Sequence, residues 1–413
     1  MTMPPRHRRT GPSEASRAST WRIRALMVIL VVEGMLAIGV IAWSGPPAGG
    51  TLAAMYEPPA PLRAADPGRP VRVWKLAAPA VHGTVYGLLY HSRSVTGKDV
   101  AVSGYLAVPD ATDAPAVPTG GRPIVTLGHG TVGMADQCAP SRDPGADAAT
   151  INPFLAQGWI VVSTDFEGIG TPGRHPYLVG TSEARSMIDA VRAARDLLGR
   201  AASSTFVAWG ISQGGHAALF TRQVAQAWAP ELHLAGAVAM APVSDLASFV
   251  TTPTIVPQAV TLEVAAGFAA AYPDLRPQQV LTPLGLRRLD DVDHYCVAPL
   301  NLRIAAVAVA RLRRTALTQV PDWERAVQAN TPGLVPSDVP VLVVQGTRDP
   351  IVPQATSQAL FRRLCAGGAP ATLDLVDNGS HADVIESARS TYLGWMADRL
   401  AGRADRSGCP STS

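Results

Sequence analysis

Charged residues are scarce in this 413-residue chain, which is 16% charged and 47% hydrophobic. This composition excludes an intrinsically disordered or highly solvated protein, because those classes are rich in charge and poor in apolar residues. Lysine is nearly absent: Lys75 and Lys98 are the two lysines, and every other basic residue is arginine. The length suits two or three domains, or one decorated domain. We therefore expect a compact apolar globule, a membrane protein, or both.

A net excess of basic charge is lacking beyond the N-terminus. The chain carries a formal +3. Residues 1–24 alone carry a net +5, from Glu14 and six arginines, so the other 389 residues carry a net −2. A body without basic excess lacks the electrostatic footprint of proteins that bind phosphate backbones. We expect no nucleic-acid partner.

Cysteines are few and widely spaced. Cys138, Cys296, Cys365 and Cys409 form no C-x-x-C pair and match no zinc-ligand spacing, so we expect no metal site. In an exported protein, an even number of cysteines predicts disulfides, here two, and the spacing leaves three connectivities open. Four buried free thiols are the alternative if the body is not exported.

One long apolar run is present, at residues 25–43, with Glu33 as its one charge. As a helix it would be about 28 Å long, close to the thickness of a bilayer core. The arginine-rich residues 1–24 predict a cytoplasmic tail, which places the body outside the cytoplasm. Small residues at Ala42 and Ser44 permit cleavage as a signal peptide, whereas the length of the run favours an uncleaved membrane anchor. We leave both open and expect a protein that is secreted or anchored to the cell membrane.

The body divides by the rhythm of its apolar runs. Residues 44–70 hold seven prolines and predict an extended linker that does not pack. Strand-like runs at 71–76, 83–90 and 100–108 predict an antiparallel start. Further short apolar runs then alternate with amphipathic helices, which is typical of an α/β protein whose mostly parallel sheet carries helices on both faces. These runs lie at residues 124–127, 159–163, 206–209, 235–239, 341–344 and 373–376.

The alternation is interrupted between residues 245 and 336, where the sequence is helical and rich in proline. So long an interruption predicts a subdomain inserted into the α/β core. We assign residues 71–244 and 337–402 to the core and residues 403–413 to a C-terminal tail.

Residues 205–219, TFVAWGISQGGHAAL, predict a strand, a G-x-S-x-G turn and a helix. A sharp turn between strand and helix exposes the serine oxygen, and the flanking glycines allow close approach of backbone. The N-terminus of the helix directs amides and a positive dipole at the place where an oxyanion would form. We therefore predict that Ser212 is a nucleophile; the alternative is an ordinary serine that caps a helix.

A serine nucleophile needs a base and an acid that orients the base. In this type of fold they follow the serine in the order acid, histidine. Asp349 follows the buried run 341–344, and His381 lies in a glycine-containing loop after the run 373–376. The competing acids are Asp245 and Asp377, and the competing bases are His129 and His216. We predict a Ser212–Asp349–His381 triad.

An oxyanion hole requires two donors. The backbone N–H of Gln213, directly after the nucleophile, is the first candidate. The second is the N–H of Thr131, in the loop after the run 124–127, with its hydroxyl as a third donor. The alternative for this loop is a tight turn that needs small residues.

These motifs together resemble the secretory lipase family, which includes the lipase A type of fungi. The resemblance covers about residues 70–402 and rests on five segments: HGT at 129–131, CAPS at 138–141, DFEGIGTPG at 165–173, HPYL at 175–178 and the turn at Ser212. It implies an α/β-hydrolase fold and hydrolysis of carboxylic esters and triacylglycerols, without a cofactor. It further implies a helical cap at residues 245–336 and a disulfide between Cys138 and Cys296, which leaves Cys365 with Cys409.

Other functions fit the same residues. A serine peptidase or an acyltransferase could use the same triad, because the triad does not determine the leaving group. A non-catalytic, membrane-tethered binding module is the alternative from outside the enzymes. The predicted partner is thus an ester or lipid substrate, with the membrane as a second partner if residues 25–43 are not cleaved.

Overall fold

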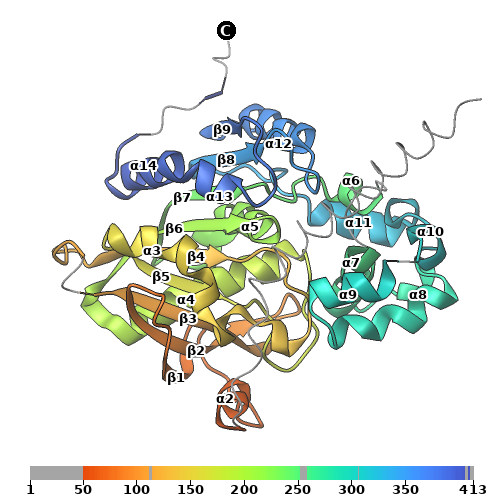
Figure 1. Ribbon diagram of the computed structural model, residues 1–413, viewed down its shortest axis with the longest axis horizontal. Coiled ribbons are helices and arrows are strands. Elements are labelled where there is room, and N and C mark those ends of the chain that lie inside the picture. Colours follow the sequence, from red (N-terminus) through yellow and green to blue (C-terminus); the bar gives the residue numbers. More distant parts are fainter. Residues whose placement is uncertain (1–49, 111–113, 252–257, 306, 405–407, 410–413) are drawn as a thin grey trace, which may run out of the picture. The chain divides into compact units, whose positions relative to one another are not determined.

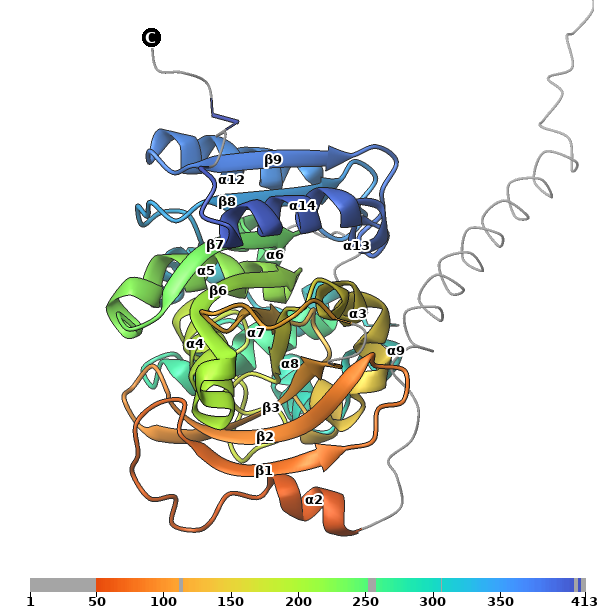
Figure 2. The same ribbon diagram turned by 90° about the vertical axis from the view of Figure 1, so that its left-hand side faces the viewer.

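The computed structural model describes residues 50–110, 114–251, 258–305, 307–404 and 408–409. These residues form one sheet of nine strands in the order β1-β2-β3-β5-β4-β6-β7-β8-β9 (Figures 1 and 2). β1 (Pro70–Leu76), β2 (Gly83–Arg93) and β3 (Asp99–Pro109) are antiparallel, and β3 pairs antiparallel with β5. The remaining six strands, from β5 to β9 in the order of the sheet, are parallel to one another. They are β4 (Arg122–Gly128), β5 (Ile160–Thr164), β6 (Ala202–Ile211), β7 (His233–Met240), β8 (Val341–Gly346) and β9 (Ala371–Val376). The predicted fold class is confirmed.

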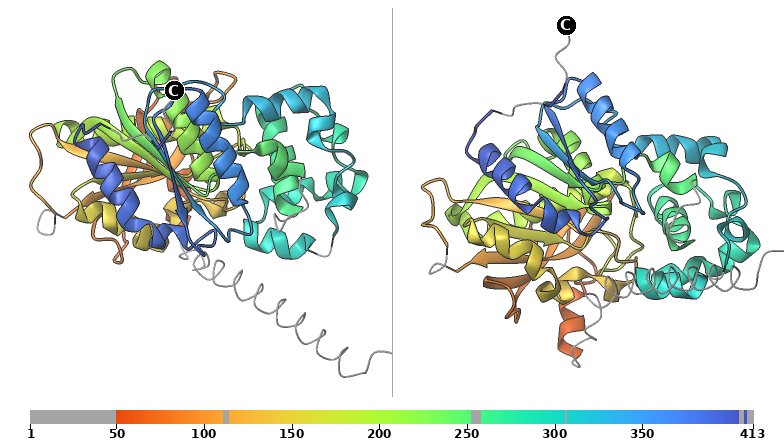
Figure 3. Two further views of the ribbon diagram at one scale, coloured as in Figure 1. Left: turned by 90° about the horizontal axis from the view of Figure 1, so that it is seen from above. Right: turned by 45° about the horizontal axis from the view of Figure 1, so that its top comes forward.

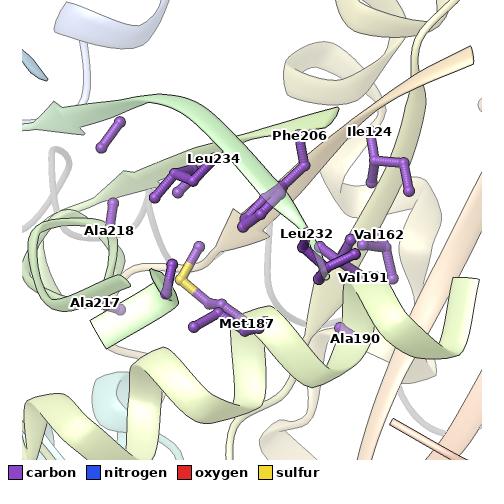
Figure 4. Close-up of a cluster of buried hydrophobic side chains, with 14 of the residues drawn as sticks. Ile124, Val162, Met187, Ala190, Val191, Phe206, Ala217, Ala218, Leu232 and Leu234 are labelled. Carbon is purple, nitrogen blue, oxygen red and sulfur yellow. The ribbon is translucent and has the colours of Figure 1, made fainter. Parts of the chain in front are cut away.

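Helices cover both faces of the sheet (Figure 3). α4 (Gly180–Leu198), α5 (Gln213–Trp228) and α12 (Gln354–Ala366) pack on one face. α3 (Ala148–Ala156), α13 (Val384–Ser387) and α14 (Arg389–Leu400) pack on the other. Figure 4 shows the core of the first face, where Phe206 and Ile124 of the sheet meet Met187 and Val191 of α4. The central strands are mostly apolar because both of their faces are buried.

The described residues between 246 and 329 form a group of short helices beside the sheet (Figure 1). They are α6 (Leu246–Thr251), α7 (Gln258–Ala271), α8 (Pro283–Arg288), α9 (Val297–Ile304), α10 (Val309–Leu312) and α11 (Pro321–Ala329). This group has its own apolar core, in which Phe268 stacks on Trp323 with ring centroids 6.3 Å apart. The interruption of the α/β pattern thus coincides with a second core.

The linker prediction for residues 44–70 was partly wrong. Residues 50–56 form helix α2 (Gly50–Tyr56), and Tyr56 is 2% exposed. Its hydroxyl hydrogen-bonds to Ser141 Oγ at 2.8 Å, and its ring contacts Trp74 edge to face. The prolines of this segment lie before and after residues 50–56 and not within them. A short apolar helix can therefore form inside a proline-rich segment.

No helix within the described ranges is both long and apolar enough to cross a membrane. The apolar run at residues 25–43, on which the anchor or signal-peptide prediction depends, lies outside those ranges, as does the basic tail at residues 1–24.

A buried carboxyl group stands out in the inserted helices. Glu263 of α7 is 0% exposed, and both of its carboxyl oxygens lack a hydrogen-bond partner among the described residues. Burial raises the pKa of this group from 4.5 to about 8, because the charged form loses its hydration without gaining a partner. Folded protein therefore keeps this proton at neutral pH, whereas unfolded chain releases it.

We expect Glu263→Gln to stabilise the protein in a pH-dependent manner. The folded-state pKa is raised, so the native carboxyl group destabilises the fold increasingly as the pH rises from about 5 to 8. The gain of the variant over wild type should be small at pH 5 and reach the order of a few kcal/mol above pH 8. Urea unfolding across this range measures it. Glu324→Gln, at an exposed position of α11, is the control and should show no such gain. An equal gain at pH 5 and pH 8.5 would exclude ionisation as the cause.

Candidate active site

Ser212 lies at the turn between β6 and α5, and it is the residue with the strained backbone there. Its φ is +56°, in the left-handed region, where a residue with a Cβ costs about 1–3 kcal/mol and where functional residues are concentrated. The backbone is held on both sides: its N–H donates to Met240 O at 2.8 Å, and its C=O accepts from the amides of His216 and Val243. The residue is mostly buried and is 8% exposed.

The two glycines of the G-x-S-x-G motif are required by contact between backbone segments. A Cβ on Gly210 would lie 2.1 Å from Gly214 O, and a Cβ on Gly214 would lie 1.8 Å from Gly128 O. Neither distance is physically accessible, so α5 can approach β4 and β6 this closely only with glycine at both positions.

Asp349 and His381 meet at the same edge of the sheet. His381 Nδ1 lies 2.7 Å from Asp349 Oδ2, and the side chains are 14% and 0% exposed, respectively. Because β6, β7, β8 and β9 are parallel neighbours, their carboxyl ends place Ser212, Asp349 and His381 along one edge. Within the described residues no hydrogen bond joins Ser212 Oγ to His381, and such contacts are often long before substrate binds.

The Asp349 carboxylate is held by four donors. Its Oδ1 accepts from the amides of Ile351 and Val352 at 2.8 Å each. Its Oδ2 accepts from Gln345 Nε2 at 3.0 Å in addition to His381. Burial raises the pKa of Asp349, but the hydrogen bonds from His381 and the two amides outweigh burial and lower it below 3.8. The group is therefore a carboxylate at neutral pH and can orient an imidazole.

Neither of the competing acids hydrogen-bonds to a histidine among the described residues. Asp245 accepts hydrogen bonds from the backbone and side chain of Ser248 in its own turn. Asp377 is exposed and makes no hydrogen bond to His381. Of the three acids considered, Asp349 is the one that contacts a histidine.

The competing bases are also engaged. His216 is 0% exposed and pairs with Glu183 at 2.7 Å, on the buried side of α5. His129 Nδ1 lies 2.7 Å from Gly130 O, and its Nε2 lies 3.3 Å from Asp165 O. Neither imidazole ring hydrogen-bonds to Ser212 or Asp349.

The two predicted oxyanion donors are the residues that follow Ser212 and Gly130 in the chain. Gln213 is the first residue of α5, so its N–H has no partner within the helix. Gly130 lies against the nucleophile, since a Cβ added there would be 3.8 Å from Ser212 Cβ, and Thr131 follows directly. The Thr131 hydroxyl is engaged with Tyr177 OH at 2.8 Å, which leaves its backbone N–H as the donor to consider.

A buried polar network beneath the turn was missed from the sequence. Glu183 of α4 contacts both Gln213 and His216, and His175 contacts Gln213 from the other side. His216 Nε2 also lies 2.8 Å from the Asn330 carbonyl, directly after α11. The sequence did hold a signal, because charged and hydroxyl residues lie on a face of α4 that is otherwise apolar. The fully or almost fully buried ones are Ser182, Glu183, Ser186 and Asp189.

The buried carboxyl group of Asp165 holds the loop after β4. Asp165 is 0% exposed and accepts from Ser103 Oγ at 2.6 Å and from both the backbone and the hydroxyl of Ser141. This loop carries Cys138, which is bonded to Cys296 of the inserted helices, while Cys365 pairs with Cys409. Both disulfides implied by the resemblance are confirmed.

The sheet order and the strand–serine–helix turn define an α/β-hydrolase fold, and the comparisons with known proteins agree. The secretory lipase family model matches residues 142–408. The chain therefore belongs to the secretory lipase family. Candida antarctica lipase A superposes with a TM-score of 0.71 at 20% identity, over 84% of each chain.

Two relatives in sequence illustrate the range of the family. A secreted triacylglycerol lipase of Malassezia globosa is 26% identical over 302 residues, which are 67% of this chain and 65% of that protein. This match thus spans slightly less than two thirds of that relative. A protein of Mycobacterium tuberculosis named "Probable inactive lipase" is 25% identical over 372 residues, 84% of this chain and 82% of that one.

We expect Gly214→Ala to destabilise the protein, because the added methyl group overlaps Gly128 O and forces α5 away from β4. Overpacking of this kind costs about 1–3 kcal/mol, measured as the free energy of unfolding in urea. Gly120→Ala is the matched control, since a Cβ there has no neighbour within 4 Å. Equal stability of the two variants would show that the close approach of the turn to β4 is not required.

Proposed function

We propose that this protein is an exported serine hydrolase that cleaves carboxylic esters through Ser212, Asp349 and His381. One observation carries the proposal: a serine with a left-handed backbone stands at the strand–helix turn, and a buried aspartate–histidine pair at 2.7 Å lies at the same edge of the sheet. Membership of the secretory lipase family supports the reaction class and the export. If residues 25–43 are uncleaved, they tether the enzyme to the membrane; if cleaved, the enzyme is released.

The proposed reaction is acyl transfer to serine and then to water. Asp349 accepts the Nδ1–H of His381, which leaves Nε2 free to take the Ser212 proton. Ser212 Oγ attacks the ester carbonyl, and the amides of Gln213 and Thr131 donate to the oxyanion. His381 then protonates the leaving alcohol, and the acyl-enzyme is cleaved by water with His381 again as the base.

The proposed substrates are lipids, and triacylglycerols are the first candidates, as the name of the Malassezia relative suggests. The inserted helices at residues 245–336 would act as a cap that supplies apolar surface for an acyl chain. A small cavity supports this placement: it is lined by Asp245 and Phe249 from the inserted segment and by Ile351 and Val352 beside the proposed acid.

Two rival readings have direct tests. A peptidase or acyltransferase would be revealed by a paired assay with p-nitrophenyl esters and aminoacyl anilides, with and without an added alcohol acceptor. A non-catalytic protein is the second candidate, because the Mycobacterium tuberculosis relative is named as inactive. Such a protein would not react with a fluorophosphonate probe, whereas the proposed enzyme should be labelled.

Ser212→Ala should lower the hydrolysis of p-nitrophenyl esters by about 10⁴–10⁶-fold, because the variant has no nucleophile but keeps the oxyanion donors. Circular dichroism and the unfolding midpoint serve as the folding control. If this variant hydrolysed esters at the wild-type rate, Ser212 would not be the nucleophile.

Asp349→Asn should lower kcat by about 10²–10⁴-fold, because an amide can donate to His381 Nδ1 and so stabilise the wrong tautomer. The matched control is Asp245→Asn, which changes the runner-up acid in the same way and should leave kcat close to wild type. If Asp245→Asn were the more damaging substitution, the acid would have to be reassigned.

A further inference from the structure

Glu183 is a buried carboxylate that no step of the proposed reaction uses. It lies in the first turn of α4 and is 0% exposed. Its Oε1 accepts from Gln213 Nε2 at 2.9 Å and from Leu178 N at 3.1 Å. A buried charge is costly unless it is fully hydrogen-bonded, so these contacts hold the carboxylate and its partners in one arrangement.

Each of the two donors to Oε1 is connected to one of the two proposed oxyanion donors. Gln213 supplies the first donor through its own backbone N–H. Leu178 adjoins Tyr177, whose hydroxyl bonds the Thr131 side chain at 2.8 Å, and Thr131 supplies the second donor. Leu178 itself has a φ of +56°, a conformation that its hydrogen bond to Glu183 helps to hold. One carboxylate oxygen thus connects both donors.

The Gln213 side chain is held from its other side by His175. The Gln213 amide nitrogen lies 2.8 Å from His175 Nε2, and His175 Nδ1 lies 2.8 Å from Glu167 O. A carbonyl can only accept, so Nδ1 carries the proton and Nε2 accepts from the amide. Burial lowers the pKa of His175 to about 4, which agrees with a neutral ring. Both amide hydrogens of Gln213 are therefore engaged, and the side chain has one orientation.

The second oxygen of Glu183 is satisfied by His216, with Nδ1 at 2.7 Å from Oε2. His216 Nε2 faces the Asn330 carbonyl, so Nε2 carries a proton. One further proton lies between Nδ1 and Oε2, which makes the pair neutral as a whole. The same pair links the turn to the residue that ends α11.

We propose that Glu183 is a positioning residue for the oxyanion hole: by binding Gln213 and Leu178 together, it sets the places of the Gln213 and Thr131 amides. This inference rests on the proposed function. Glu183 is fully buried and does not touch the substrate, so its effect passes through those amides. Its loss should weaken stabilisation of the oxyanion, a species that exists only in the tetrahedral state.

Two substitutions of similar length separate positioning from packing. Glu183→Met removes the acceptors and leaves the Gln213 and Leu178 donors unpaired. Glu183→Gln can restore the whole network, because the introduced amide oxygen accepts from both donors and its NH₂ donates to a neutral His216. Rescue by this variant is the result expected of a hydrogen-bonding role.

The readout is the ratio of kcat/KM for an ester to kcat/KM for the matching thionoester, with rates expressed per site titrated by a fluorophosphonate. Sulfur is a weaker hydrogen-bond acceptor than oxygen, so the thionoester benefits less from the amides. Glu183→Met should lower ester turnover by about 10²-fold and the ratio by at least about tenfold. KM should change little, and Glu183→Gln should keep the wild-type ratio.

Equal losses on ester and thionoester in Glu183→Met would overturn the positioning role, since a purely structural defect lowers both. If that variant does not fold, Gln213→Met tests the same link while keeping the other contacts of Glu183, and an unchanged ratio there overturns the proposal. Wild-type protein that neither hydrolyses the ester nor reacts with the probe would instead overturn the proposed function, and this inference with it.

Discussion

The close approach between the turn at Ser212 and strand β4 governs the rest of the site. Gly214 faces Gly128 O at a distance that no Cβ allows, and Gly210 faces Gly214 in the same way. This contact fixes the start of α5, directly after Ser212, whose backbone has a left-handed conformation. Backbone strain here is maintained by packing on all sides, as expected where strain serves function.

Buried charge is organised around this turn in two ways. Asp349 is surrounded by donors, so its pKa is lowered and it remains charged beside His381. Glu183 is likewise surrounded, by Gln213, Leu178 and His216. Glu263 has no such partner in the part of the chain that the structure describes, and its pKa is raised to about 8. Hydrogen bonds thus lower the pKa of Asp349 in spite of its burial, whereas burial without a partner raises the pKa of Glu263.

Much of this arrangement could be predicted from the sequence. The parallel strands are apolar runs because both faces are buried, and the G-x-S-x-G turn has a strict steric requirement that glycine alone meets. Asp349 and His381 were located because parallel strands bring their carboxyl ends to one edge. The helix at residues 50–56 was missed because the flanking prolines dominate the composition of residues 44–70. The contact that holds it, from Tyr56 to the buried Ser141, exists only in the folded chain. The buried polar residues of α4 were a signal, but the contacts of Glu183 could not be predicted, since its partners come from separate segments that meet only in the folded chain.

The central claim is that Ser212 carries the acyl group during turnover. Rapid acid quench of the full chain with a long-chain p-nitrophenyl ester, followed by intact mass measurement and peptide mapping, tests it most directly. The account predicts one added acyl group per chain, on the peptide that contains Ser212, and none in Ser212→Ala. An acyl group on another residue, or ester turnover without any acylated intermediate, would contradict it.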